Sequence, residues 1–212
     1  MNKSIFWLIG LLFVASFSIT SCDETDGVED PYANWEERNQ RYIDSIATVA
    51  KTNQGNGVGQ WKIVRSYKLP DLGLNEIEKV NDNVYCKIMK VGDGTESPLY
   101  TDSVRVNYRG RLINDVVFDQ SYQGELDPDA ATPVGFGVGK VITGWTTALM
   151  EGFGDMKVGD RWEVYIPYQL AYGRSATSGI PAYSTLIFDM NLVEVIKMKA
   201  TGRNIIEDVK AE

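Results

Sequence analysis

The side chains that could do chemistry in this sequence form a narrow set, because histidine is absent and cysteine occurs only twice. Without histidine, neither a Ser-His-Asp nor a Cys-His arrangement can form, and no metal can be held by imidazole, so we predict no metal site and no cofactor. The remaining candidates are a group of aromatic residues and one acid, Asp119, which follows apolar residues in the sequence. Aromatic side chains with a few placed hydrogen-bond donors are typical of a dry binding pocket. The aromatic candidates are Tyr108, Phe118, Trp145, Tyr172 and Phe188.

These candidates lie in a series of short motifs that runs in order through the second half of the chain. The motifs are Val104-x-Val-x-Tyr108-x-Gly110-x-Leu112, Val117-Phe118-Asp119-x-Ser121, Pro133-x-x-Phe136, Gly139-x-Val141-Ile142-x-Gly144-Trp145, Met156-x-x-Gly159, Ile166-Pro167, Leu170-Ala-Tyr172-Gly173, Ile180-Pro181 and Leu186-x-Phe188-Asp189. Each motif is weak alone, but the ordered set is highly specific. The series resembles the FKBP immunophilins, which are peptidyl-prolyl cis/trans isomerases, and it defines a domain over residues 82–198.

The resemblance implies an α+β fold in which a twisted antiparallel β-sheet wraps around one short α-helix. The residues that match the family's catalytic positions are Tyr108, Asp119, Ile142, Trp145 and Tyr172, and those that match its substrate-binding positions are Phe118, Val134, Phe136, Val141, Ile180 and Phe188. In the family, the amide N–H equivalent to Ile142 and the hydroxyl equivalent to Tyr172 donate hydrogen bonds to carbonyl groups of the ligand. The implied partners are proline-containing polypeptides and macrolide immunosuppressants.

The activity that the resemblance implies needs no nucleophile, because no covalent bond is made or broken. Rotation about an X-Pro bond faces a barrier of roughly 18–20 kcal/mol, since amide resonance must be lost. The twisted amide is less dipolar than the planar one, so a dry aromatic pocket favours the twisted state over the planar states. Trp145 would form the floor under the proline ring, and Asp119 would orient Tyr108 or polarise the amide region.

Two departures from the family pattern leave alternatives open. The stretch 120–132 is longer than in compact members, and Val134 stands where many members have an aromatic residue. The chain could therefore be a catalytically weak FKBP-like binding module or chaperone. A third alternative is a surface lipoprotein that binds glycans, because aromatic and carboxylate residues can also bind sugars. Two site residues also have structural alternatives. Trp145 could be a core residue, and Asp119 could be a buried acid hydrogen-bonded to a tyrosine.

The elements that must position these residues follow from the spacing of apolar side chains. Strict alternation predicts half-buried antiparallel strands. The strand segments are 61–69, 84–88, 102–113, 161–167 and 185–195. Residues 144–150 have helical spacing and predict the short helix. We assign residues 60–81 to a strand and a connection that pack on the domain, and expect Trp61, Cys86, Trp162 and Tyr165 in its core.

Residues 34–51 predict an extra N-terminal helix, followed by a linker up to residue 59. Asn34 and Glu37 have the spacing of a capping box. The apolar stripe of this helix is Trp35, Ile43, Ile46, Val49 and Ala50. Either the domain or a second copy of the chain must cover that stripe, and we favour the domain.

The amino-terminal residues predict export. Residues 1–21 are typical of a secretory signal, with Lys3 before an apolar run. Ile19-Thr20-Ser21-Cys22 resembles the lipobox of bacterial lipoproteins, in which the cysteine is lipidated; the alternatives are a plain signal peptide or a signal anchor. We expect a protein of the cell envelope that meets the membrane only through its lipid on Cys22, at the outer membrane and facing the periplasm or the surface.

Two further segments and the net charge complete the prediction. Residues 22–33 are acidic and predict a flexible tether, either a plain spacer or a segment resembling the surface-export signal of Bacteroidetes lipoproteins. Residues 199–212 are assigned to a C-terminal tail. The formal net charge of -8 argues against a nucleic-acid partner, because phosphate binding needs a basic surface.

Overall fold

The structure is a computed structural model that describes residues 30–198. The chain divides into two units, 1–33 and 34–212, and all elements described below belong to the second. The predicted signal, the predicted lipidation site Cys22, most of the predicted tether and the C-terminal tail lie outside the described residues. Within those residues, no helix is long and apolar enough to cross a membrane.

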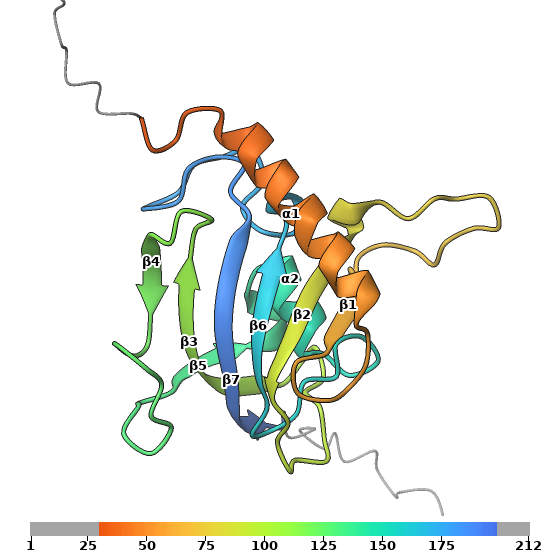
Figure 1. Ribbon diagram of the computed structural model, residues 1–212. Coiled ribbons are helices and arrows are strands. Elements are labelled where there is room, and N and C mark those ends of the chain that lie inside the picture. Colours follow the sequence, from red (N-terminus) through yellow and green to blue (C-terminus); the bar gives the residue numbers. More distant parts are fainter. Residues whose placement is uncertain (1–29, 199–212) are drawn as a thin grey trace, which may run out of the picture. The chain divides into compact units, whose positions relative to one another are not determined.

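One antiparallel sheet of seven strands forms the body of the second unit (Figure 1). The strands are β1 (Trp61–Arg65), β2 (Asn83–Lys90), β3 (Ser103–Arg111), β4 (Val117–Gln120), β5 (Val134–Gly137), β6 (Arg161–Ile166) and β7 (Leu186–Ile196). Their order is β1-β2-β6-β7-β3-β4. The first half of β3 pairs with β5 and its last residues pair with β4. The chain between β4 and β5 therefore leaves and rejoins the sheet along the same strand.

Two α-helices lie on the sheet, α1 (Trp35–Thr52) and α2 (Thr143–Leu149). Figure 1 shows α1 crossing one face of the sheet and α2 behind the other face. Gly144 permits the close approach of α2, because a Cβ at this position would lie 2.4 Å from Cγ2 of Ile166. Three short 3-10 helices complete the fold: η1 (Val80–Asp82), η2 (Val138–Lys140) and η3 (Tyr168–Leu170). The predicted α+β class, the short helix and the extra N-terminal helix are confirmed.

The predicted core residues are buried. Trp162 on β6 is 2% exposed, and Tyr165, on the opposite face of the same strand, packs on Trp61 with ring centroids 5.5 Å apart. Cys86 is free and fully buried. Burial raises the pKa of the Cys86 thiol to about 12, so the thiol stays protonated near neutral pH and is a packing residue.

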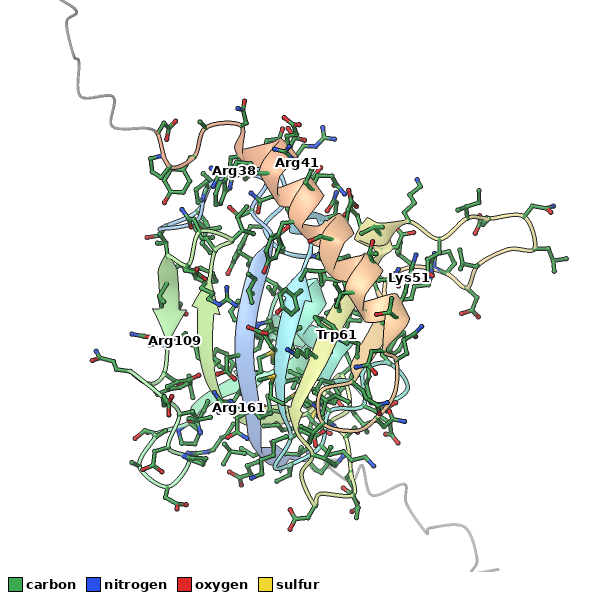
Figure 2. The ribbon with its side chains drawn as sticks, in the orientation of Figure 1. Arg38, Arg41, Lys51, Trp61, Arg109 and Arg161 are labelled. Carbon is green, nitrogen blue, oxygen red and sulfur yellow. The ribbon has the colours of Figure 1, made fainter. Side chains whose placement is uncertain are left out.

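The apolar face of α1 is covered by the domain's own sheet. Ile43, Ala47 and Ala50 form one buried cluster with side chains of the sheet, which are Trp61, Tyr85, Tyr165 and Ile187. Figure 2 shows Trp61 beside the C-terminal part of the helix. The favoured interpretation of the stripe is therefore confirmed, except that Val49 is half exposed and lies outside it.

Three local predictions were wrong. Asn34 is left-handed (φ 52°) and its side chain makes no capping hydrogen bond, so α1 has no capping box. The strand predicted over 61–69 ends at Arg65, because the following residues form a turn closed by a hydrogen bond from the Leu69 N–H to the Ser66 carbonyl (3.0 Å). The alternation over 102–113 puts Asn107 on the outer face of β3, but Asn107 is fully buried and donates its Nδ2–H to Oδ1 of Asn191 on β7 (3.4 Å).

A buried asparagine ties α1 to the chain that enters β7. Asn39 is fully buried, and its Oδ1 accepts a hydrogen bond from the Thr185 N–H (2.7 Å). Its Nδ2 donates to the carbonyl of Trp35 (2.7 Å), whose indole N–H in turn donates to Oγ of Ser184 (2.9 Å). The N-terminal half of α1 therefore holds the segment that precedes β7.

Asn39→Ala is expected to lower the free energy of unfolding by about 1–3 kcal/mol, because the buried Thr185 N–H loses its acceptor. Urea unfolding monitored by tryptophan fluorescence measures the change. Ser45→Ala, on the exposed side of the same helix, is the matched control and should change stability by less than about 0.5 kcal/mol. Equal stability of Asn39→Ala and the control would contradict the role of Asn39 in holding the segment before β7.

Candidate functional site

A pocket of about 420 Å³ opens between the end of the sheet and α2. Its lining residues come from six elements and two connections: Tyr108, Phe118, Asp119, Phe136, Lys140, Val141, Ile142, Trp145, Tyr172 and Phe188. The pocket is mostly aromatic, with a few polar groups at its wall. No group of three or more potential metal ligands occurs among the residues that the structure describes.

Trp145 on α2 is the centre of an aromatic box. Its ring lies edge-to-face against three others, with centroid distances of 5.3 Å to Tyr108, 5.3 Å to Phe136 and 5.1 Å to Phe188. Phe118 on β4 extends the box through Phe188, at 5.5 Å and 86°. Edge-to-face pairs add roughly 0.5–1.5 kcal/mol each beyond burial, so the rings hold one another in place.

Gly110 on β3 makes room for the box. A Cβ at this position would lie 2.5 Å from Cζ of Phe118 and 2.7 Å from Cε1 of Phe188. Distances below 3.0 Å do not occur between real Cβ atoms and their neighbours, so any larger residue would displace the two rings. The motif glycine two residues after Tyr108 is therefore part of the site geometry.

The polar part of the wall is a tyrosine–carboxylate pair. The Tyr108 hydroxyl donates to Oδ2 of Asp119 (2.8 Å), and Tyr108 itself is 7% exposed. Burial raises the pKa of the Tyr108 phenol above its usual range, and the hydrogen bond to Asp119 adds to that shift. The phenol is therefore protonated near neutral pH and can donate this hydrogen bond. Asp119 is exposed, so the alternative of a buried acid was wrong.

The segment before α2 presents backbone to the pocket. Val141 and Ile142 line it, and Ile142 precedes the first residue of α2 in an extended conformation. The Ile142 N–H makes no hydrogen bond to another described residue. It is therefore available to a ligand, as is the hydroxyl of Tyr172, whose side chain is 47% exposed.

Val134 and Ile180 do not line the pocket, although both were predicted to. Val134 lies at the start of β5 with its side chain 38% exposed. Ile180 is buried, and a Cβ on its neighbour Gly179 would lie 3.8 Å from Cβ of Phe118. The other predicted pocket residues are brought together, and Cys22 lies outside the described residues.

Lys140 lines the pocket but was not among the predicted site residues. It occupies the unassigned position between Gly139 and Val141, and its stem packs over Gly137, where a Cβ would lie 3.1 Å from Cγ of Lys140. The sequence offered one indication that Lys140 lines the pocket, which is its position directly before Val141 and Ile142. Alternation could not have found it, because η2 is neither strand nor α-helix.

The long 120–132 stretch leaves the pocket wall unchanged. None of its residues lines the pocket. Tyr122, near its start, is 9% exposed and donates its hydroxyl to Oδ2 of Asp189 (2.6 Å), which also pairs with Arg161. The guanidinium of Arg109 lies 5.6 Å from the Tyr122 ring centroid. These contacts fix the beginning of the stretch on the sheet, outside the pocket; Figure 2 labels Arg109 and Arg161.

Seven antiparallel strands, a short helix and an aromatic pocket around a tryptophan define an FKBP-like α+β protein. Residues 94–193 match the family model described as FKBP-type peptidyl-prolyl cis-trans isomerase. The macrophage infectivity potentiator of Trypanosoma cruzi is 34% identical over 198 residues, which cover 92% of this chain and 83% of that protein. The chain therefore belongs to the FKBP-type peptidyl-prolyl cis-trans isomerase family.

Two bacterial proteins show the same relationship. The peptidyl-prolyl cis-trans isomerase Mip of Coxiella burnetii is 40% identical over 122 residues, 57% of this chain and 48% of that protein. The crystal structure of FkpA from Escherichia coli superimposes with a TM-score of 0.52 and 31% sequence identity, over 77% of this chain and 60% of that one. The chain spans about half the length of the first curated relatives it matches.

Proposed function

We propose that this protein is a peptidyl-prolyl cis/trans isomerase that acts on proline-containing polypeptides in the course of their folding. The observation that carries the proposal is the aromatic box around Trp145, with the Tyr108–Asp119 pair in its wall. The names of the related proteins support it. The pocket is large enough for a proline ring and the amide before it, and its mostly aromatic lining disfavours the more dipolar planar amide.

Each part of the pocket has a role in this proposal. The proline ring packs on the indole of Trp145, between the rings of Phe136 and Phe188. The Ile142 N–H and the Tyr172 hydroxyl donate to carbonyl groups of the substrate and hold the chain on both sides of the rotating bond. Tyr108 and Asp119 present a fixed dipole toward the amide. No step requires a proton transfer, so the barrier falls through differential binding of the twisted state alone.

The direct test is a protease-coupled assay with a four-residue peptide that contains one X-Pro bond. We expect acceleration proportional to enzyme concentration in the nanomolar to micromolar range. The alternative function, a binding module without turnover, shares the same pocket. Peptide binding without acceleration at micromolar protein would replace the isomerase with that alternative.

Tyr108→Phe is expected to lower kcat/KM between about 10- and 100-fold, because hydrogen bonds to charged groups contribute roughly 1.5–3 kcal/mol. Asp119→Asn should have a similar effect through the same pair. The matched control is Tyr122→Phe, which removes a tyrosine–carboxylate hydrogen bond to Asp189 outside the pocket. A loss of turnover in the control equal to that in Tyr108→Phe would show that stability, and not the pocket, is responsible.

We also propose that the mature protein is anchored in the cell envelope by lipid on Cys22, in accord with the lipobox-like sequence before it. Metabolic labelling with a radioactive fatty acid should mark the wild-type protein and leave Cys22→Ala unlabelled. Labelling of both forms, or of neither, would contradict the anchor.

Macrolide binding is a further proposal, tested by inhibition of the four-residue peptide assay with a macrolide immunosuppressant.

A further inference from the structure

Three aromatic side chains gather on the surface beside the pocket and outside its wall. Tyr67 follows β1, Tyr100 precedes β3, and Phe153 follows α2. The ring of Tyr67 lies between the other two, with centroid distances of 5.8 Å to Tyr100 and 6.2 Å to Phe153. We call these three residues the aromatic patch.

The aromatic patch is open to solvent. Tyr100 is 48% exposed and Phe153 is 40% exposed, while Tyr67 between them is partly buried. Leu99 next to Tyr100 is 46% exposed and widens the apolar area. Single exposed apolar residues are common, but large side chains that cluster on one surface mark interaction sites, and aromatic rings are enriched there.

The patch is continuous with the pocket through η2. The Tyr100 ring packs directly on the backbone of Gly139, where a Cβ would lie 2.6 Å from the ring. The two residues that follow, Lys140 and Val141, line the pocket. The aromatic patch and the pocket lining therefore meet at consecutive residues of one short segment, 139–141.

We propose that the aromatic patch is an accessory site that binds an apolar side chain of the polypeptide whose X-Pro bond occupies the pocket. An extended chain advances about 3.3 Å per residue, so a side chain a few positions from the proline reaches over η2 to the patch. The occupant is a non-native polypeptide, because folded proteins keep such side chains buried. The inference rests on the proposed function, which supplies the proline in the pocket.

This arrangement gives the protein a preference among X-Pro bonds that the pocket alone cannot provide. The pocket contacts the proline and its immediate neighbours, whereas the aromatic patch adds affinity from a residue farther along the chain. Lys68, whose ammonium lies 5.7 Å from the Tyr67 ring centroid, and Lys140 border the two ends of this path. Acidic residues between the proline and the apolar side chain are therefore compatible with binding.

The experiment compares fluorescein-labelled 16-residue peptides that contain one X-Pro bond and, at three to eight residues from it, either Phe or Ser. Both the N-terminal and the C-terminal placements are tested. Dissociation constants are measured by fluorescence anisotropy. For the wild type, we expect at least one placement where the Phe peptide binds about tenfold more tightly than the Ser peptide, the effect of burying part of one aromatic side chain.

The variant Tyr100→Ser/Phe153→Ser should bind the Phe and Ser peptides within about twofold of each other. Turnover of the four-residue peptide should stay at the wild-type level in this variant, because neither residue lines the pocket. The matched control is Val49→Ser/Met89→Ser, which removes two side chains of 50% and 45% exposure on α1 and β2. The control should keep the tenfold preference.

Two results would overturn the inference: equal affinity of the wild type for Phe and Ser peptides at every placement, or a preference that survives in Tyr100→Ser/Phe153→Ser. Failure of the proposed function is a separate outcome, seen as no acceleration of the four-residue peptide by the wild type. Because the affinities are measured at equilibrium, they decide the role of the patch even in that case.

Discussion

Trp145→Ala is expected to reduce kcat/KM for the four-residue peptide by at least about 100-fold, because displacement of catalytic contacts by about 1 Å already has this effect. Trp145 is 4% exposed, and its indole contacts the rings of Tyr108, Phe136 and Phe188. Its loss therefore leaves a cavity and removes the ring that holds these three side chains in place. The free energy of unfolding should fall by about 3–5 kcal/mol. Urea unfolding and the protease-coupled assay measure the two effects.

A milder pair of variants separates the loss of turnover from the loss of stability. Trp145→Phe keeps an apolar ring in the pocket. It also removes an Nε1–H that is buried without an acceptor among the described residues. Loss of this unpaired donor stabilises the protein and offsets part of the destabilisation from lost packing. Trp162→Phe makes the same change in the core on β6, away from the pocket. Both variants should have a lower free energy of unfolding than the wild type, but only Trp145→Phe should lose turnover. We expect a loss of about tenfold or more, because one lost pocket contact of roughly 1.4 kcal/mol changes the rate tenfold. Wild-type turnover in Trp145→Phe and Trp145→Ala would exclude the pocket as the site.

Gly110→Ala is expected to reduce turnover by about 100-fold through a single added methyl group, since it must displace two pocket rings. The new Cβ would lie 2.5 Å from Phe118 and 2.7 Å from Phe188, and these rings form the far side of the box. Overpacking of this kind lowers the free energy of unfolding by about 1–3 kcal/mol. Macrolide or peptide binding should weaken in parallel with turnover.

Gly135→Ala is the matched control for this prediction. Gly135 lies on β5, which pairs with the same strand as β4, and a Cβ there would meet nothing within 4 Å. Turnover and stability should stay close to the wild-type values. Loss of turnover in Gly135→Ala, or normal turnover in Gly110→Ala, would contradict the role that the structure gives to the space above Gly110.

Much of the fold could be read from the residues themselves. A strand that is buried on one face must alternate, so the pattern around Val104 and Trp162 predicted both the strands and their inward residues. The helix at α2 followed from its spacing in the same way. The ordered motif series added what periodicity lacks, because it identified which inward residues, such as Tyr108 and Trp145, would share one pocket.

Local patterns failed where a distant partner decides the outcome. Asn107 lies on the outer face of the alternating pattern, yet it is fully buried and donates a hydrogen bond to Asn191, 84 residues away. The helical pattern over 34–51 assigned no role to Asn39, because its hydrogen-bond partner Thr185 is 146 residues away. Period-two and helical spacing specify the face on which a side chain lies, but they do not specify what covers that face.

The residues of the sequence alone were therefore enough for the class of fold, the strand faces and most of the pocket wall. Only the tertiary structure placed Lys140 in the pocket, moved Val134 and Ile180 off its wall and left Asp119 exposed beside Tyr108. It also brought Tyr67, Tyr100 and Phe153 together from three separate connections. Connections lack a repeating backbone geometry, so the positions of their side chains follow from packing against the finished sheet and helix.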